Sequence, residues 1–299
     1  MKYPVAILAT FTILSLVDCA TVPLKKAWSN DDGSRGVVEA LETQARKGDP
    51  EAEFQLGNIY YEGHLFDRDY PKAFEHYLRA ATKGLPEAET QLAYLYLEGL
   101  GVQKDYTESL NWFKAAAALG SDKAQFWAGV IYADGLGVTA DPAEALKWYR
   151  LSAEQGNMFA QTNIGFSYLG GEGVDKDSQK ALEWFRKSAT QEDPVAEYAI
   201  GSMYQEGVGV EKSSEDAFKW YMLSASHRLK WADYLLGKKY EQGDGVKPDL
   251  PLAAMWYRIA VGDGNSEAKS DLDRVEAQLG QDEIDLETEQ AVSWVASHH

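Results

Sequence analysis

The stretch AETQLAYLYLEGLGVQKDYTESLNWFKAAAALG, at residues 88–120, decides the fold of this 299-residue chain. It returns 36 residues later as AQFWAGVIYADGLGVTADPAEALKWYRLSAEQG, at residues 124–156, with no insertion between the two copies. One tyrosine marks the period along the chain, at Tyr60, Tyr96, Tyr132, Tyr168, Tyr204 and Tyr240. A fixed period of this length is the signature of stacked structural units, so we expect six repeats.

Each repeat has the pattern of two helices joined by a glycine loop. In the first copy Ala52, Leu56 and Ile59 fall on one face at helical spacing, within a helix predicted over residues 50–62. In the later copies a Gly-x-Gly-Val loop ends the first helix, because glycine adopts positive φ readily, whereas the first copy has Gly63-His64-Leu65-Phe66 at this place. An aspartate then opens the second helix, where its charge suits the helix N-terminus: Asp105, Asp141, Asp177 and Asp249. The pattern predicts an all-α solenoid of helix-turn-helix repeats.

Glycines at two kinds of position carry further predictions. Glycine inside the first helix costs about 1 kcal/mol relative to alanine, so its recurrence predicts a large ring or a backbone packed against it. These glycines are Gly57, Gly129, Gly165, Gly201 and Gly237. A second glycine ends the second helix, as at Gly156, but Glu192 and Arg228 replace it later. We expect those two turns to differ.

The repeated pattern, Ala-x-x-x-Leu-Gly-x-x-Tyr followed by Gly-x-Gly-Val, Asp, Ala-x-x-Trp-Tyr, Ala-Ala and Gly, resembles Sel1-like repeats, which are relatives of the tetratricopeptide repeat. The resemblance covers residues 37–279. It implies a right-handed α-solenoid, and a function as an adaptor or scaffold that binds proteins. A cysteine-rich branch of the family holds its helix pairs with disulfides. This chain has one cysteine and does not fit that branch.

The repeats also suggest a division of the chain: a signal peptide (1–18), a tether (19–33), a capping half-repeat (34–48) with Ser34 as its N-cap, six repeats (49–267) and C-terminal capping helices (268–299). The last helix is predicted over residues 282–297. We expect Ile284, Ala291, Val292 and Val295 to face inward and Glu283, Glu287 and Glu289 to face outward. Its role is to cover the last apolar face, or alternatively to dock on a partner.

The first residues resemble an export signal. Lys2 precedes an apolar run at residues 5–17, which is too short to span a bilayer as a helix. Leu16-Val17-Asp18-Cys19 resembles the lipobox of bacterial lipoproteins, in which the cysteine becomes the lipidated residue, although Asp18 stands where a small residue is usual. The open alternatives are lipidation of Cys19, soluble export and an uncleaved N-terminal anchor. We expect an exported protein on the periplasmic side, touching the membrane only through this segment.

Charge and motifs narrow the classes of function. A formal charge of −18 argues against nucleic acid and is compatible with a basic protein segment, or simply with solubility. Trp28 stands where a calcium loop needs its first carboxylate. None of the five histidines has metal-ligand spacing, and His76 occupies a slot that tryptophan fills in other repeats. We predict no catalytic residue, metal or cofactor.

The first helices carry a variable stripe whose members are spaced by four, three and four residues, and so share one helical face. The resemblance places this face on the concave side of the solenoid. It predicts an acidic groove with aromatic side chains, made by Gln91, Tyr94, Glu98, Lys123, Trp127, Val130, Asp134, Phe159, Asn163 and Phe166. The alternative is that the rings simply pack between neighbouring first helices.

Three functions follow from these observations. The first is a scaffold at the bacterial cell envelope that binds a protein partner through the groove. The second is a lipid-anchored assembly factor of the polysaccharide-export type, with the solenoid as a spacer. The third, more remote, is an enzyme acting on cell-wall material.

Overall fold

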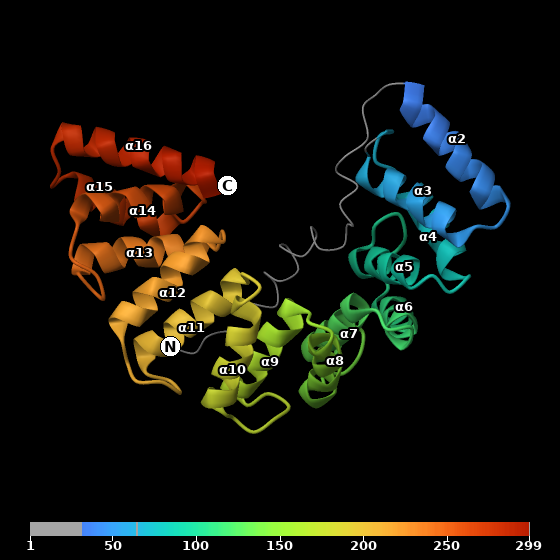
Figure 1. Ribbon diagram of the computed structural model, residues 1–299, viewed down its shortest axis with the longest axis horizontal. Helices are drawn as coiled ribbons and strands as arrows, with labels where there is room; N and C mark the ends of the chain where they lie inside the picture. Colours follow the sequence, from blue (N-terminus) through green and yellow to red (C-terminus); the bar gives the residue numbers. More distant parts are fainter. Residues whose placement is uncertain (1–31, 64, 299) are drawn as a thin grey trace. The chain divides into compact units, whose positions relative to one another are not determined.

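The computed structural model describes residues 32–63 and 65–298, and within them the chain is all-α, with 15 helices and no strand (Figure 1). Its fold class is the α-solenoid that the repeats predict. The helices are α2 (Asp32–Arg46), α3 (Pro50–Glu62), α4 (Tyr70–Ala81), α5 (Pro86–Glu98), α6 (Tyr106–Ala118), α7 (Asp122–Asp134), α8 (Pro142–Glu154), α9 (Met158–Gly170), α10 (Ser178–Ala189), α11 (Pro194–Glu206), α12 (Ser214–Ser226), α13 (Lys230–Gln242), α14 (Leu250–Gly262), α15 (Ser266–Glu276) and α16 (Gln281–His298).

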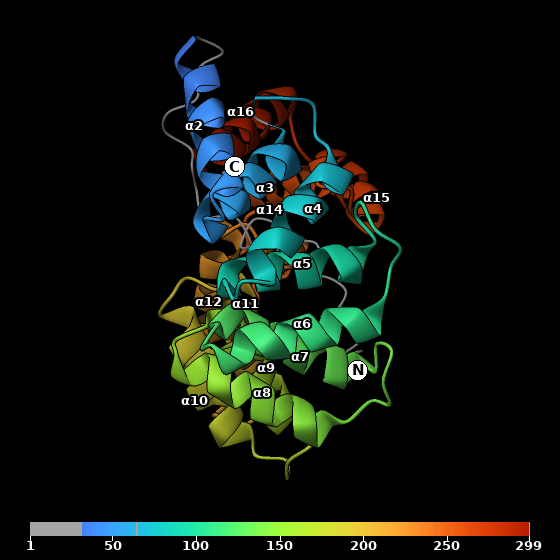
Figure 2. The ribbon, with the colours of Figure 1, turned by 90° about the vertical axis from the view of Figure 1, so that its right-hand side faces the viewer.

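These helices form two compact units. The first holds the described residues up to Ala160 together with 172–174, and the second holds 161–171 and the chain from Asp175 onward, so the division falls within α9. In the first unit the hairpins α3–α4, α5–α6 and α7–α8 follow one another, each packed on the next, and α2 packs on α3 (Figure 2). In the second unit α10 to α14 continue the same pattern, and α15 and α16 both pack on α14.

The predicted signals at the helix ends are confirmed. Each of the four aspartates is an N-cap whose carboxylate accepts a backbone N–H, as Asp105 does from Thr107 and Glu108. Five first helices end at a glycine with left-handed backbone: Gly63, Gly99, Gly135, Gly207 and Gly243. The first helix α3 has the bounds that the sequence predicts. The helix α2 begins at Asp32, so Ser34 lies within the helix and its predicted role as the N-cap is wrong.

The turns at Glu192 and Arg228 correct the sequence-based expectation. Both residues adopt positive φ, 63° and 71°, as Gly156 does with 97° in the equivalent turn. The backbone bonds are also equivalent, because Glu192 N donates to Ala189 O at 3.0 Å just as Gly156 N donates to Ala153 O at 3.0 Å. The turn is thus set by the hydrogen bonds that end the helix, and it persists without the glycine.

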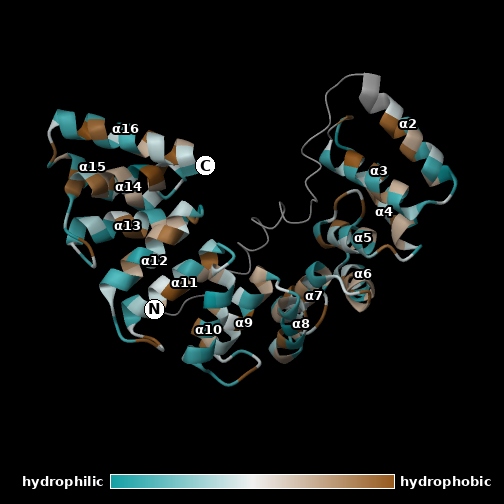
Figure 3. Cartoon of the chain, in the orientation of Figure 1, coloured by the Kyte–Doolittle hydropathy of each residue, from teal (hydrophilic) through white to brown (hydrophobic). Residues whose placement is uncertain are grey.

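The cores of the two units lie where neighbouring helices meet. In the first unit Tyr77, Leu92, Phe113 and Ile131 are fully buried, and hydrophobic and hydrophilic residues are interspersed along the helices (Figure 3). The prediction for His76 as a packing residue is confirmed, since its ring stacks on Tyr60 at 5.5 Å between centroids.

The last helix closes the second unit differently from the prediction. Glu287 is fully buried and pairs with Arg258 of α14, so its predicted outward position is wrong. Val292 is 66% exposed and Val295 is 37% exposed, so their predicted inward positions are wrong as well. Ala291 is buried as predicted. The helix thus turns a different face to α14 from the one that the sequence predicts. The pairing of Glu287 with Arg258 accounts for this face, and the sequence pattern does not reveal it.

Candidate functional site: a groove on the first helices of unit one

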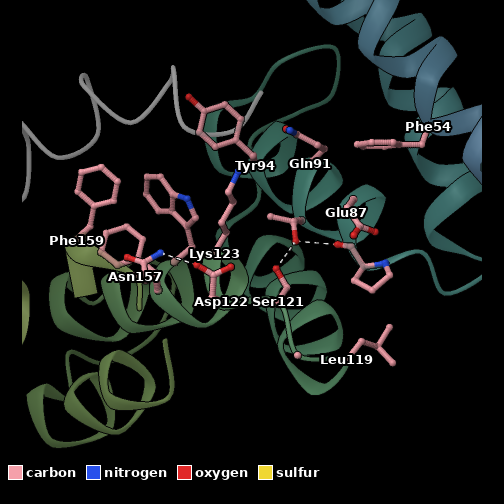
Figure 4. Close-up of a pocket in the computed structure, with 15 residues that line it drawn as sticks. Phe54, Glu87, Gln91, Tyr94, Leu119, Ser121, Asp122, Lys123, Asn157 and Phe159 are labelled. Carbon is pink, nitrogen blue, oxygen red and sulfur yellow. Dashed lines mark hydrogen bonds between the residues drawn. The ribbon is translucent and has the colours of Figure 1, made fainter. Parts of the chain in front are cut away.

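A groove of about 410 Å³ lies on the first unit and is built by the first helices of three successive repeats (Figure 4). Phe54 of α3, Tyr94 of α5 and Trp127 of α7 all line it. The start of α9 adds Phe159, and the turn after α6 adds Leu119, Gly120 and Ser121. The four aromatic residues occupy different slots of the repeat, but these slots share one face of the first helix, and stacking of the repeats brings the faces together.

Aromatic rings form the floor of the groove. The ring of Trp127 stacks on Phe113 with 6.1 Å between centroids, and it also contacts Tyr94 at 6.0 Å and Phe126 at 5.6 Å. Tyr94 and Trp127 are only 6% and 8% exposed. Burial raises the pKa of the Tyr94 hydroxyl, so this phenol stays neutral in the folded protein. The floor is therefore apolar and closely packed.

The same contacts bear on the two interpretations of the aromatic stripe. Tyr94 and Trp127 pack between neighbouring helices and also line the groove, so the two interpretations are compatible at these positions. Phe159 is half-buried and contacts Phe126 at 6.1 Å, which leaves part of its ring on the rim.

The rim of the groove is polar and of mixed charge. Asp122 accepts a hydrogen bond from Asn157 Nδ2 at 2.9 Å, and Thr90 donates to the carbonyl of Pro86 at 2.8 Å. Glu87 is exposed and Lys123 is half-buried, and both side chains line the groove (Figure 4). An apolar floor with a polar rim is the usual anatomy of a surface that binds another protein.

The structure brings together half of the predicted stripe. The five stripe residues that line the groove are Gln91, Tyr94, Lys123, Trp127 and Phe159. The other five do not line it: Glu98, Val130 and Asp134 in the first unit, and Asn163 and Phe166 in the second. Val130 is buried, and Phe166 packs edge-on against Phe185 of α10, with 4.9 Å between centroids.

The sequence analysis missed several groove residues that share one repeat slot. Phe54, Thr90 and Phe126 are 36 residues apart and all line the groove. The next copies of this slot are Thr162, Tyr198 and Tyr234, so four of the six copies are aromatic. That aromatic content was a usable signal, but the slot lies outside the stripe that the sequence analysis considered.

Within the described residues 32–63 and 65–298, no group of three or more His, Cys, Asp or Glu side chains is placed to hold a metal ion. No helix among them is long and apolar enough to cross a membrane. Cys19 and the export signal lie outside the described residues.

The chain matches the Sel1 repeat model at residues 50–85, 86–121, 122–157, 159–193, 194–227 and 232–265. It is similar to the crystal structure of a Sel1 repeat protein from Oxalobacter formigenes, at 32% identity and a TM-score of 0.69, over 76% of this chain and 99% of that one. A search of curated proteins finds no match.

A second similar structure is c5321, a protective antigen of uropathogenic Escherichia coli strains with an SLR fold. The identity is 28% and the TM-score 0.54, over 87% of this chain, which spans 64% of that protein. The six matched repeats cover well over half of the sequence, and the helical hairpins seen here are the structural form of those repeats. The chain belongs to the Sel1 repeat family.

Proposed function

We propose that this protein is an interaction scaffold whose first unit holds an extended segment of a partner protein in the groove. Sel1 repeat proteins generally mediate protein–protein interaction, and their scaffold fold is typically non-enzymatic. The observation that carries the proposal is the groove itself, with Tyr94, Trp127 and Phe159 on its surface. Aromatic residues at the centre of a patch are the side chains that most often dominate protein binding.

The chemistry of the groove favours a particular kind of partner segment. Its floor accepts an aliphatic or aromatic side chain, which would pack against Trp127 and Phe159. The exposed carboxylate of Glu87 and the net charge of −18 favour a segment with positive charge, because opposite charges steer the encounter of two proteins.

We place this scaffold at the bacterial cell envelope. The support is the apolar run at residues 5–17 followed by Cys19. Fractionation of cells producing the full chain tests the location, and mass spectrometry of the mature N-terminus tests lipidation. A lipidated protein that moves from the membrane to the soluble fraction in Cys19→Ala supports the anchor. A cytoplasmic protein that retains residues 1–18 would exclude export.

Site-specific crosslinking tests the groove. A photoreactive phenylalanine analogue at Phe159 should capture a partner in the native cell, since this ring lies on the rim. The matched control is the same analogue at Lys147, which is 71% exposed in the same unit and does not line the groove. Capture at equal yield from both positions, or from Lys147 alone, would contradict the assignment of the groove.

A specificity test separates binding from nonspecific contact. Glu87→Lys reverses the exposed charge of the groove without removing a core ring, so the protein should fold, repel a positively charged segment and lose most of the crosslink at position 159. The crosslinked product is identified by mass spectrometry. An unchanged product in Glu87→Lys would show that the capture does not depend on the charge of the groove.

A further inference from the structure

One slot of the first helix holds a buried polar side chain in every repeat. Its six occupants are Glu53, Glu89, Gln125, Gln161, Glu197 and Asp233, and none is more than 7% exposed. A polar group removed from water in this way costs free energy unless it gains a hydrogen-bond partner. The question for each repeat is therefore which residue supplies that partner.

In the later repeats the partner comes from a fixed place, thirty residues further on, in the turn after the second helix. Gln155 Nε2 donates to Gln125 Oε1 at 2.8 Å, and Gln191 Nε2 donates to Gln161 Oε1 at 3.0 Å. The Nδ1 atom of His227 lies 2.9 Å from both carboxylate oxygens of Glu197. In these three repeats the side chain in the slot therefore contacts the residue thirty positions later, in the turn after the second helix.

The first repeat satisfies its slot in another way. Glu53 pairs with His76 at 2.7 Å and with Arg79 at 3.2 Å, both from α4. The donor that contacts the buried oxygen therefore comes either from the turn after the second helix or, in the first repeat, from the second helix itself.

In the second repeat neither of these two places supplies a donor to the Oε2 atom of Glu89. Glu89 is 5% exposed, and its Oε2 atom has no hydrogen-bond partner among the residues that the structure describes. Burial raises the pKa of this carboxyl group. Thirty residues on stands Leu119, which cannot donate a hydrogen bond. Leu119 is 55% exposed and lines the groove, whereas Glu89 is not one of the residues that line it (Figure 4).

We propose that the partner segment held in the groove carries a lysine or arginine whose side chain passes Leu119 and pairs with Glu89. This inference rests on the proposed function and specifies the partner's chemistry. The aliphatic stem of such a side chain would pack on Leu119, while its charged end reaches the carboxylate. Gly120 lines the groove beside Leu119 and has no side chain to block the approach. The bound partner would thus give Glu89 the hydrogen-bond partner that the slot has in other repeats.

Two substitutions isolate the pair without disturbing the fold. Glu89→Gln places in this slot the residue that Gln125 and Gln161 already provide, so the chain should fold while losing the charge. Leu119→Gln supplies an internal partner for Glu89, as Gln155 does for Gln125, and it should compete with the cation. The matched control is Leu151→Gln, at a leucine of α8 that is 46% exposed and does not line the groove.

The probe is a library of random short peptides displayed on phage and selected on the full chain. We expect the wild type and Leu151→Gln to enrich peptides with an apolar residue and, at a fixed spacing from it, lysine or arginine. The enriched peptide should bind Glu89→Gln and Leu119→Gln about tenfold to a hundredfold more weakly. Replacing its basic residue by glutamine should weaken binding to the wild type equally, and to Glu89→Gln hardly at all.

The outcomes separate this inference from the proposed function. If peptides are enriched, lose binding in Glu87→Lys, and bind Glu89→Gln as tightly as wild type, the groove function stands and the pairing with Glu89 is wrong. If no peptide is enriched, both proposals fail. Equal weakening by Leu151→Gln would show that any new polar side chain on this unit weakens binding, and it would overturn the pairing.

Discussion

Gly129 of α7 lies directly against the ring of Tyr149 of α8, where a Cβ atom would stand 2.6 Å from Cδ1 of the ring. Real Cβ atoms do not approach other carbons so closely, so a residue larger than glycine at position 129 would force the ring to shift. The second repeat differs, since its equivalent residue is Ala93. The same contact recurs between Gly57 and Tyr77, and between Gly237 and Tyr257. The predicted ring against each helical glycine is thus confirmed, and it sets how closely the two helices of a hairpin approach.

The first prediction concerns this contact. Gly129→Ala should lower the free energy of unfolding by about 1–3 kcal/mol, because Tyr149 is fully packed and cannot move aside. Helix propensity alone would give the opposite sign, a gain of up to about 1 kcal/mol. Chemical denaturation followed by circular dichroism measures the difference.

Gly36→Ala is the control for that experiment, because Gly36 lies within α2 and a Cβ there would meet no atom within 4 Å. This substitution should be neutral or stabilise the protein by up to about 1 kcal/mol. If both alanine variants change stability in the same direction, the ring does not explain the glycine in the first helix.

The repeat explains why so much of the fold could be predicted. The caps at Asp105 and Gly99, and the glycine opposite Tyr149, are local devices that recur at a period of 36 residues. Six copies of one signal remove the ambiguity of each single copy. The turn at Glu192 escaped prediction, since a charged residue there hides a backbone conformation that neighbouring hydrogen bonds impose.

The groove was predicted only in part, for a different physical reason. Spacing along a helix shows which residues share a face, so Tyr94 and Trp127 were found. It does not show where a face is open and where it is covered. Phe166 shares the stripe but packs on Phe185, and Leu119 reaches the groove from a turn that the stripe does not include.

The second prediction concerns pH. Asp233 of α13 is 3% exposed, and burial, followed by the charge of Asp263 and a hydrogen bond to it, raises the pKa of Asp233 to about 8. Lys230 acts in the opposite direction, with its Nζ atom 3.0 Å from Asp263 Oδ1. The folded protein thus keeps a proton on Asp233 that the unfolded chain releases near its ordinary pKa of 3.8.

A group with a raised pKa makes its full contribution to stability below the unfolded value and loses it as pH rises to the folded value. The free energy of unfolding should therefore fall between about pH 4 and about pH 8, and then level off. Asp233→Asn is neutral throughout, so it should flatten this profile and raise stability at pH 8 by about 1–3 kcal/mol.

Denaturation curves at several pH values measure this effect as the difference between variant and wild type. Asp175→Asn serves as the control, because Asp175 is exposed in a loop of the same unit. A wild-type-to-Asp233→Asn difference that stays constant from about pH 5 to about pH 8 would show that Asp233 does not titrate in this range.

The third prediction concerns the attachment of α16, which stands outside the repeat. Glu287 is fully buried, and its Oε1 atom lies 2.6 Å from an Nη atom of Arg258. Arg258 also pairs with Glu276 of α15. Arg258→Met should destabilise the protein by about 3–5 kcal/mol, because it leaves the carboxylate of Glu287 buried without a cation. Arg258→Met with Glu287→Leu should recover most of this loss, since two apolar side chains replace a buried pair well.

Hydrogen exchange shows where the loss falls. Amides of α16 should exchange faster in Arg258→Met, while those of α5 and α6, which lie in the first unit, should keep their rates. Arg274→Met is the matched control: Arg274 is 49% exposed and pairs with Glu241 at the surface, so its loss should cost at most about 1 kcal/mol. Equal effects of the two arginine substitutions would mean that burial does not distinguish these pairs. The polarity of Glu287 would then be incidental, and the packing of Trp294 on Trp256, with 4.8 Å between ring centroids, would be left as the contact that holds the helix.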